Sequence, residues 1–362
     1  MMTLLMTGAS GYLGTTLVPM LIAEGFSVRA VDRFFFGRGL LRPHVNLQQI
    51  REDTRRLALE DFRGIDGVLD LAALSNDAAG TTFEKATWEI NCETRIRTAM
   101  LAKQAGVRRY VLASSCSVYG CQERDVYAHE YSATNPLTVY AKANEAAEEG
   151  VLALADDGFA VTVLRLATLH GASPRMRYDL VVNRMIHDAW IKGRIRVMRD
   201  GTQLRPMLHV GDAARAFIAA LLAPAALAAG QKFNVGSEME TYTVFELARI
   251  VAEGVSGTVE LDYYGDPDQR SYRPAFDKIE RLGWTPRDSL ETTVCEITEG
   301  LAQGKLPMTS MTITCEWYRE LERWHQALRE MGTGSDLAQT DDYAVWRTRI
   351  AELEMYGGIL AI

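Results

Sequence analysis

The sequence lacks the long apolar run and the positive charge that would direct the chain to a membrane or to nucleic acid. Its longest apolar stretch, residues 213–229, is interrupted by Arg215 and Pro224, whereas a membrane-spanning helix needs roughly 20 uninterrupted apolar residues. The first residues lack a basic segment, so we expect no signal peptide. Lysine and arginine total 39 against 47 acidic residues, for a net charge of −8. Neither nucleic acid nor an anionic membrane is therefore an expected partner.

Cysteine is also scarce, and its spacing excludes two further kinds of site. The five cysteines are odd in number and include no Cys-x-x-Cys pair: Cys92, Cys116, Cys121, Cys295 and Cys315. This pattern argues against a disulfide scaffold and against a zinc site. We therefore expect no metal and a reducing, cytoplasmic environment.

What the chain does have is a regular alternation of short apolar runs and helical patterns. It has 362 residues, of which 48% are apolar and 24% charged, a composition typical of globular proteins. The pattern predicts strands at 4–7, 27–31, 68–71, 110–113 and 160–166, and helices at 15–24, 91–105 and 141–156. Strands separated by helices require crossover connections. We therefore predict an α/β fold with a Rossmann-like, doubly wound parallel sheet.

After residue 166 the alternation breaks down, which indicates further parts of the chain. We expect an NAD-binding Rossmann domain at 1–166 and a smaller α+β substrate-binding lobe at 167–308, with 208–236 returning to the first domain. Residues 309–362 are expected to form a helical C-terminal extension.

This extension carries an apolar stripe with helical spacing, at Trp317, Leu321, Trp324 and Leu328. A second helix is expected at about 343–356. The stripe either packs on its own chain or forms a subunit contact, and the sequence leaves both open.

A glycine motif, Thr-Gly-Ala-Ser-Gly-Tyr-Leu-Gly, follows the first predicted strand and opens the first helix. Glycines allow a tight turn and let backbone N–H groups approach a pyrophosphate at the positive end of the helix. Asp32 ends the second strand. A carboxylate at this position accepts hydrogen bonds from the ribose hydroxyls and repels a 2′-phosphate. The expected cofactor is therefore NAD, although the neighbouring Arg33 weakens that preference. The cofactor contacts expected from this region are Gly8, Ser10, Gly11, Tyr12, Leu13, Gly14, Asp32 and Arg33.

The spacing of this motif resembles that of the extended short-chain dehydrogenase/reductase family, and more motifs follow in the family's order. They include Asp-Leu-Ala-Ala at 70–73, Asn91, Ser-Ser-Cys-Ser-Val-Tyr-Gly at 114–120 and Arg-Pro-Met-Leu-His-Val-Gly-Asp at 205–212. The resemblance implies an NAD-dependent sugar-nucleotide epimerase or dehydratase type of enzyme that forms a homodimer. It also implies further cofactor contacts at Asp53, Thr54, Leu71, Ala72 and Ala73.

The resemblance assigns the acid/base to Tyr140 and the orienting hydroxyl to Ser115, but the chain departs from the family's Tyr-x-x-x-Lys pattern. The lysine position is Asn144. Lys142 does not replace it, because residues two apart on a helix face nearly opposite sides. Loss of the cation should raise the pKa of the phenol and slow the reaction by about 10- to 1000-fold. Asn144 is still expected to contact the nicotinamide ribose, and a catalytically weakened binding protein is an alternative.

The residues after Ser115 decide between reaction types. The family's 4,6-dehydratases have an Asp-Glu pair where this chain has Cys116 and Ser117, so neither dehydration nor decarboxylation is expected. An alternative is a 3- or 3,5-epimerase of a keto sugar, in which Cys116 and His170 exchange protons. A buried, inert cysteine is the commoner case.

The substrate expected from the resemblance is a nucleoside-diphosphate sugar. Arginines are suited to bidentate contacts with its phosphates. The residues assigned to it are Ser115, Ser117, Asn183, Arg205, Arg270 and Arg273. Together these features predict NAD-dependent oxidation of a sugar hydroxyl, at carbon 4, by an epimerase or a 4-dehydrogenase.

Overall fold

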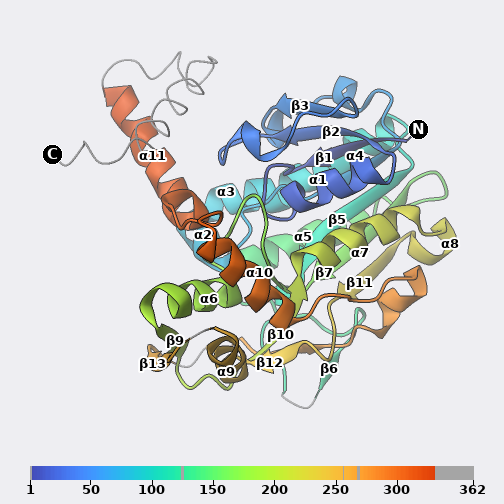
Figure 1. The fold of residues 1–362 in the computed structure, drawn as a ribbon. Helices are drawn as coiled ribbons and strands as arrows, with labels where there is room; N and C mark the ends of the chain where they lie inside the picture. Colours follow the sequence, from blue (N-terminus) through green and yellow to red (C-terminus); the bar gives the residue numbers. More distant parts are fainter. Residues whose placement is uncertain (1, 124–125, 256, 267–269, 331–362) are drawn as a thin grey trace. The chain divides into compact units, whose positions relative to one another are not determined.

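Seven parallel strands form the main sheet of the computed structural model, which describes residues 2–123, 126–255, 257–266 and 270–330. The strands are β1 (Thr3–Thr7), β2 (Ser27–Asp32), β3 (Leu47–Arg51), β4 (Gly67–Asp70), β5 (Arg109–Ser115), β7 (Ala160–Leu166) and β11 (Gln231–Val235). Their order is β11-β7-β5-β4-β1-β2-β3 (Figure 1). The chain runs outward from β1 in one direction and then from β4 in the other, so the strand order reverses between these two strands. This confirms the predicted Rossmann-like fold.

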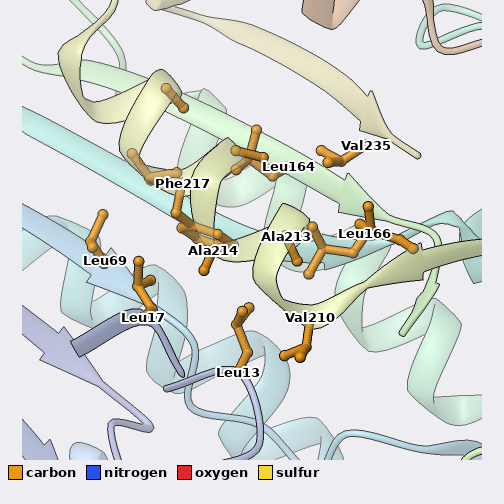
Figure 2. Packing of buried hydrophobic residues seen from close by; sticks show 14 of the residues in the cluster. Leu13, Leu17, Leu69, Leu164, Leu166, Val210, Ala213, Ala214, Phe217 and Val235 are labelled. Carbon is orange, nitrogen blue, oxygen red and sulfur yellow. The ribbon is translucent and has the colours of Figure 1, made fainter. Parts of the chain in front are cut away.

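Helices cover both faces of this sheet because successive strand residues point to opposite faces. Leu4 and Met6 pack in one core cluster with α1 (Gly14–Ala23) and α7 (Val210–Leu222), whereas Leu5 packs in another with α4 (Arg95–Gln104) and α5 (Val139–Leu152). Figure 2 shows part of the first cluster, in which Phe217 of α7 and Leu164 of β7 are buried.

In the described part of the chain, three small sheets lie outside the main one. They are β12-β10-β8, β13-β9 and β14-β6. Their strands are β6 (Tyr127–Ala128), β8 (Thr168–His170), β9 (Arg194–Met198), β10 (Leu204–His209), β12 (Thr241–Thr243), β13 (Glu260–Tyr264) and β14 (Arg273–Pro274). The remaining helices of this part are α2 (Asp77–Thr82), α3 (Glu84–Trp88), α6 (Val181–Lys192), α8 (Ala225–Ala228), α9 (Val244–Gly254) and α10 (Leu290–Ala302).

The chain divides into two compact units, Met1–Thr312 and Ile313–Ile362. In the first unit, α7 packs on the main sheet and β11 forms its edge, so the chain returns to the sheet after the excursion that holds β8 to β10. The predicted division into a Rossmann domain and a substrate lobe at residue 166 stays a prediction.

Of the second unit, the structure describes one helix, α11 (Thr314–Glu330). On this helix, the side chain of Trp317 is buried and that of Trp324 is exposed. The helix predicted at about 343–356 lies outside the described residues. Within the described ranges, no helix combines the length and hydropathy needed to cross a bilayer.

Candidate active site

The loop between β1 and α1 forms a turn that requires glycine at two positions. Gly8 has a φ of +66°, and a Cβ there would lie 2.8 Å from the backbone nitrogen of Ala72. A Cβ on Gly14 would lie 2.5 Å from the Gly8 carbonyl oxygen. Both distances are shorter than any normal contact, so no side chain fits at either position. A turn built in this way lets a phosphate approach backbone N–H groups closely.

The segment that follows β4 is tied to this turn by hydrogen bonds. The Thr7 hydroxyl accepts from the backbone nitrogens of Leu71 and Ala72, each at 3.1 Å. The buried side chain of Asn91 braces the same segment, since its Oδ1 accepts from the Leu74 nitrogen at 2.9 Å. The carboxyl ends of β1 and β4 therefore meet in one place, at the switch point where α/β sheets bind ligands.

Asp32, at the end of β2, holds the glycine turn in place. Its carboxylate accepts hydrogen bonds from the backbone nitrogens of Ser10 at 3.0 Å and Phe34 at 2.6 Å. Burial raises the pKa of Asp32, and these two bonds act in the opposite direction by stabilising the charged form. The remaining acceptor capacity of this carboxylate is suited to ribose hydroxyls.

Asp53, which follows β3, has a different environment because two arginines surround it. The Asp53 carboxylate lies 3.0 Å from Arg33 Nη1 and 2.8 Å from Arg55 Nη2. Burial would raise the pKa of Asp53, but the hydrogen bonds and charge of Arg55, together with the charge of Arg33, lower it to about 2. Arg33 is thus paired with an acidic group of its own chain. Thr54 begins the short helical turn that Asp53 caps.

Tyr140 lies on the first turn of α5, and the Ser115 hydroxyl at the end of β5 lies near enough to its phenol to lower the pKa of that phenol. Removal from water raises the pKa of Tyr140. The positive charge of Arg95 has the largest opposing effect, Asp77 raises the pKa, and the Ser115 hydroxyl and the charge of Arg177 lower it. The predicted tyrosine and serine are therefore brought together, and the charge around them comes from Arg95, Asp77 and Arg177.

Asn144, one helical turn after Tyr140, is buried and has both ends of its amide engaged. Its Nδ2 donates to the Tyr140 carbonyl oxygen at 2.8 Å, and its Oδ1 accepts from Arg95 Nη1 at 2.8 Å. Arg95 begins α4 directly after a π-helical turn, Glu89–Thr94, and its Nε donates to the Ala72 carbonyl oxygen at 3.1 Å. The contact expected between Asn144 and a ribose stays a prediction.

Cys116 and His170 have separate partners and are each buried in the form that does not carry charge. Cys116 Sγ donates to the Arg165 carbonyl oxygen at 3.2 Å, and burial strongly raises the pKa of the thiol. His170 Nδ1 lies 2.7 Å from the Thr293 hydroxyl, and burial lowers the pKa of the imidazole to about 3. Burial thus disfavours thiolate and imidazolium, the forms through which a proton shuttle works. Their placement lends no support to that alternative.

Two of the arginines predicted to bind substrate lie next to each other. Arg205 Nη1 donates to the Arg270 carbonyl oxygen at 2.5 Å, and the Arg270 guanidinium is ion-paired with Asp77. Asp77 also accepts a hydrogen bond from Thr138, the N-cap of α5, at 2.6 Å. Because Asp77 acts electrostatically on Tyr140, this pair of arginines lies on the same side of the molecule as the phenol.

The other residues predicted to bind substrate divide into two groups. Ser117 Oγ and Arg273 Nε are buried and have no hydrogen-bond partner among the described residues. Asn183, in contrast, is engaged inside the protein: its Oδ1 accepts from the Gly171 nitrogen at 3.0 Å, and its Nδ2 lies 3.2 Å from the Tyr12 hydroxyl. Substrate contacts for all of these residues stay predictions.

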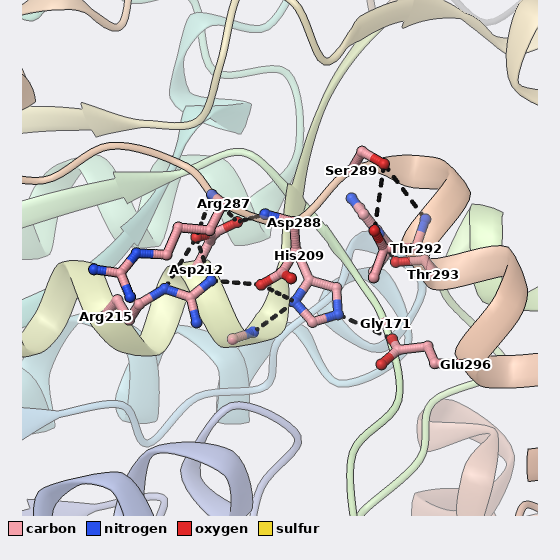
Figure 3. Close-up of polar contacts among 12 residues, drawn as sticks. Gly171, His209, Asp212, Arg215, Arg287, Asp288, Ser289, Thr292, Thr293 and Glu296 are labelled. Atoms are coloured by element: carbon pink, nitrogen blue, oxygen red, sulfur yellow. Dashed lines mark hydrogen bonds and ion pairs between the residues drawn. The ribbon is translucent and has the colours of Figure 1, made fainter.

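The His-Val-Gly-Asp part of the last motif has a structural role (Figure 3). His209 Nδ1 accepts from the Gly211 nitrogen at 3.1 Å, and its Nε2 lies 2.9 Å from Glu296 Oε1. Asp212 accepts from the Arg287 nitrogen at 2.9 Å. These contacts join the start of α7 to α10 and to the segment before it.

Sequence reasoning missed two charged residues near Tyr140, namely Arg95 and Asp77. Arg95 follows Asn91 by four residues, a spacing that places both on one face of a helix. The sequence could therefore have indicated that Arg95 places a charge on the buried face of that helix. Asp77 lies outside every motif, and nothing in the sequence distinguished it.

A parallel sheet with a glycine turn at its switch point, and a tyrosine–serine pair at the same edge, define a dinucleotide-dependent enzyme of the Rossmann class. The model of the NAD dependent epimerase/dehydratase family matches residues 4–236, and the chain belongs to this family. The resemblance stated from the motifs is thus confirmed.

Curated relatives act on different nucleotide sugars. The chain is 27% identical over 309 residues to UDP-glucuronic acid decarboxylase 1 of Arabidopsis thaliana, a match that covers 79% of this chain and 67% of the relative. It is 28% identical over 312 residues to UDP-glucose 4-epimerase of Mycolicibacterium smegmatis, covering 82% and 98%. The chain therefore spans about two thirds of the length of that decarboxylase and nearly all of the epimerase.

Among solved structures, MoeE5 in complex with UDP-glucose and NAD is similar in both sequence and fold. It is 30% identical to this chain with a TM-score of 0.73, and the match covers 83% of this chain and 99% of MoeE5. The same protein has been solved with UDP-glucuronic acid and NAD.

Proposed function

We propose that this protein is an NAD-dependent enzyme that oxidises a hydroxyl, at carbon 4, of a nucleoside-diphosphate sugar. It then either returns the hydride, as an epimerase, or releases the keto sugar, as a dehydrogenase. The observation that carries the proposal is the proximity of the Tyr140 phenol to the Ser115 hydroxyl at the same sheet edge as the glycine turn. The similarity to MoeE5 and to a UDP-glucose 4-epimerase supports it.

The residues around the glycine turn fit NAD. The turn between Gly8 and Gly14 would hold the pyrophosphate, and Asp32 would accept the adenosine ribose hydroxyls. A 2′-phosphate would need a nearby cation, and Arg33 is instead ion-paired with Asp53. This pairing supports NAD over NADP. When bound, NAD supplies the acceptor for a hydride.

The glycine turn gives a test of this assignment. Gly8→Ala should raise the Kd for NAD at least about tenfold, because the added Cβ collides with the Ala72 backbone and deforms the turn. The matched control is Gly25→Ala, since Gly25 also has a positive φ (+86°) but a Cβ there meets nothing within 4 Å. It should lose stability to backbone strain and keep its Kd, as measured by calorimetric titration. Equal Kd changes in the two variants would contradict the assignment.

Oxidation of the sugar removes a hydride from carbon and a proton from the hydroxyl oxygen. Tyr140 accepts that proton, and Ser115 orients the reacting oxygen by hydrogen bonding. In an epimerase, the same phenol returns the proton when the hydride comes back to the other face. Ser117, whose Oγ has no partner among the described residues, is suited to a further sugar contact.

The diphosphate of the substrate is assigned to the arginines near Asp77. Arg205 and Arg270 are adjacent, and a guanidinium matches phosphate oxygens in a bidentate way. The serine at position 117 supports oxidation and epimerisation rather than elimination, because it cannot act as the acid that a departing hydroxyl requires.

The experiment that tests the proposal supplies UDP-, GDP-, CDP- and TDP-sugars to the NAD-loaded protein. Absorbance of NADH and NMR spectra of the sugars are followed together. We expect one sugar class to give a C4 epimer without net NADH, or a C4 keto sugar with NADH. Failure of every sugar to react, with NAD bound, would contradict the proposal. Formation of a homodimer stays a prediction.

A further inference from the structure

Arg95 is a buried cation without an acidic partner among the described residues. Its exposed fraction is 2%, and its guanidinium donates to two neutral oxygens, those of Ala72 and Asn144. No ion pair to this guanidinium occurs in the part of the chain that the structure describes. Burying a charge without a counter-charge is costly, so such a residue is expected to serve an anionic group that arises elsewhere.

Another buried arginine of the same sheet shows the usual arrangement. Arg165 on β7 is 1% exposed and forms an ion pair with Glu148 at 2.6 Å, where the glutamate is equally buried. Arg165 therefore has its counter-charge inside the protein, and Arg95 does not. The difference indicates that the charge of Arg95 is not there to stabilise an internal carboxylate.

Three groups that can become anionic lie near Arg95: the phenols of Tyr140 and Tyr110 and the thiol of Cys92. Tyr110 donates to the Asp70 carboxylate, which raises the pKa of its phenol, and of the three only Tyr140 is joined to the Arg95 guanidinium through Asn144. Arg95 Nη1 contacts Asn144 Oδ1 at 2.8 Å, and the other end of this amide contacts the Tyr140 backbone. The charged groups that act on the phenol are Arg95 from α4, Asp77 from α2 and Arg177 from the loop before α6. Asp77 and Arg177 are each paired, with Arg270 and Asp179 respectively, which leaves Arg95 as the unneutralised charge of the three.

We propose that Arg95 supplies from α4 the positive charge that the family's Tyr-x-x-x-Lys pattern places at position 144, with Asn144 as the bridge that holds the guanidinium in place. Arg95 is thus a positioning residue that favours the phenolate form of Tyr140. This inference rests on the proposed function, since it takes Tyr140 as the acid/base. It also explains why an asparagine suits position 144: a lysine there would put a second cation against Arg95.

Three variants test the proposal on the NAD-loaded protein: Arg95→Met, Arg95→Lys and the double variant Arg95→Met/Asn144→Lys. The pH profile of kcat/KM and the ultraviolet titration of Tyr140, taken as the difference from each matching Tyr140→Phe protein, are both recorded. Because the cation favours phenolate, its removal should move the titration of Tyr140 up by about 1–3 pH units. The rate at neutral pH should fall about 10- to 1000-fold. Arg95→Lys and the double variant should restore both toward wild type.

The outcomes separate this proposal from the proposed function. The titration needs no sugar, so it reports on Arg95 even if every nucleotide sugar fails to react. Unchanged titration in a folded, NAD-binding Arg95→Met protein would overturn the role of Arg95. If Arg95→Met does not fold, the double variant decides, because it keeps the charge count. A folded double variant whose phenol titrates far above that of wild type would also overturn the proposal.

Discussion

Tyr140→Phe is expected to lower kcat by about 10²- to 10⁴-fold while leaving the Kd for NAD within a few fold of wild type. The change removes only the hydroxyl that accepts the proton of the sugar, and the ring still fills the same volume at the start of α5. Burial raises the pKa of this phenol and Arg95 lowers it, so the wild-type rate should increase with pH through the titration of Tyr140. The variant should lose that pH dependence together with its activity.

Steady-state kinetics across pH and calorimetric titration with NAD make this measurement. Tyr263→Phe is the matched control, because Tyr263 lies on β13 with 47% of its surface exposed. It should keep wild-type kinetics. Retention of more than about a tenth of kcat in Tyr140→Phe would show that another group moves the proton.

Arg165→Met is expected to lower the free energy of unfolding by about 3–5 kcal/mol, the largest stability effect that we anticipate. Arg165 and Glu148 join β7 to α5 as a fully buried ion pair, with nitrogen–oxygen distances of 2.6 to 3.1 Å. Removal of the guanidinium leaves the buried Glu148 carboxylate with only the longer ion pair to Lys232, at 3.9 Å. The Ser114 hydroxyl, which donates to Glu148 Oε1 at 2.5 Å, compensates only part of that loss.

Urea unfolding of three proteins tests this expectation. Arg165→Met/Glu148→Gln should recover part of the lost stability, because neither buried group is then an unpaired charge. Arg249→Met breaks an exposed pair with Glu253, whose side chains are 61% and 65% accessible, and should change stability by less than about 1 kcal/mol. Similar losses for Arg165→Met and Arg249→Met would refute the argument from burial.

The elements of the central fold were predictable because their signals are local. The strand at β1, the glycine turn and α1 follow one another within residues 3–23, and each is identified by spacing and residue type. Tyr140 and Ser115 were identified by motif, as was the absence of lysine at position 144. The edge strand β3 was missed, because Leu47–Arg51 has few apolar residues and becomes a strand by pairing with β2.

The sequence alone therefore determined the class of fold, the position of the glycine turn and the tyrosine that we propose as the proton carrier. The tertiary structure alone decided which charges surround that carrier. Arg95 is 49 residues from Asn144 in the chain, and Asp77 is 193 from Arg270, so these pairs meet only once the crossovers have brought the strand ends together. The effect of each charge depends on burial and on its partners. The charge of Arg95 has a strong electrostatic effect on its surroundings because the guanidinium is buried beside neutral oxygens. The charge of Arg33, in contrast, is neutralised by Asp53.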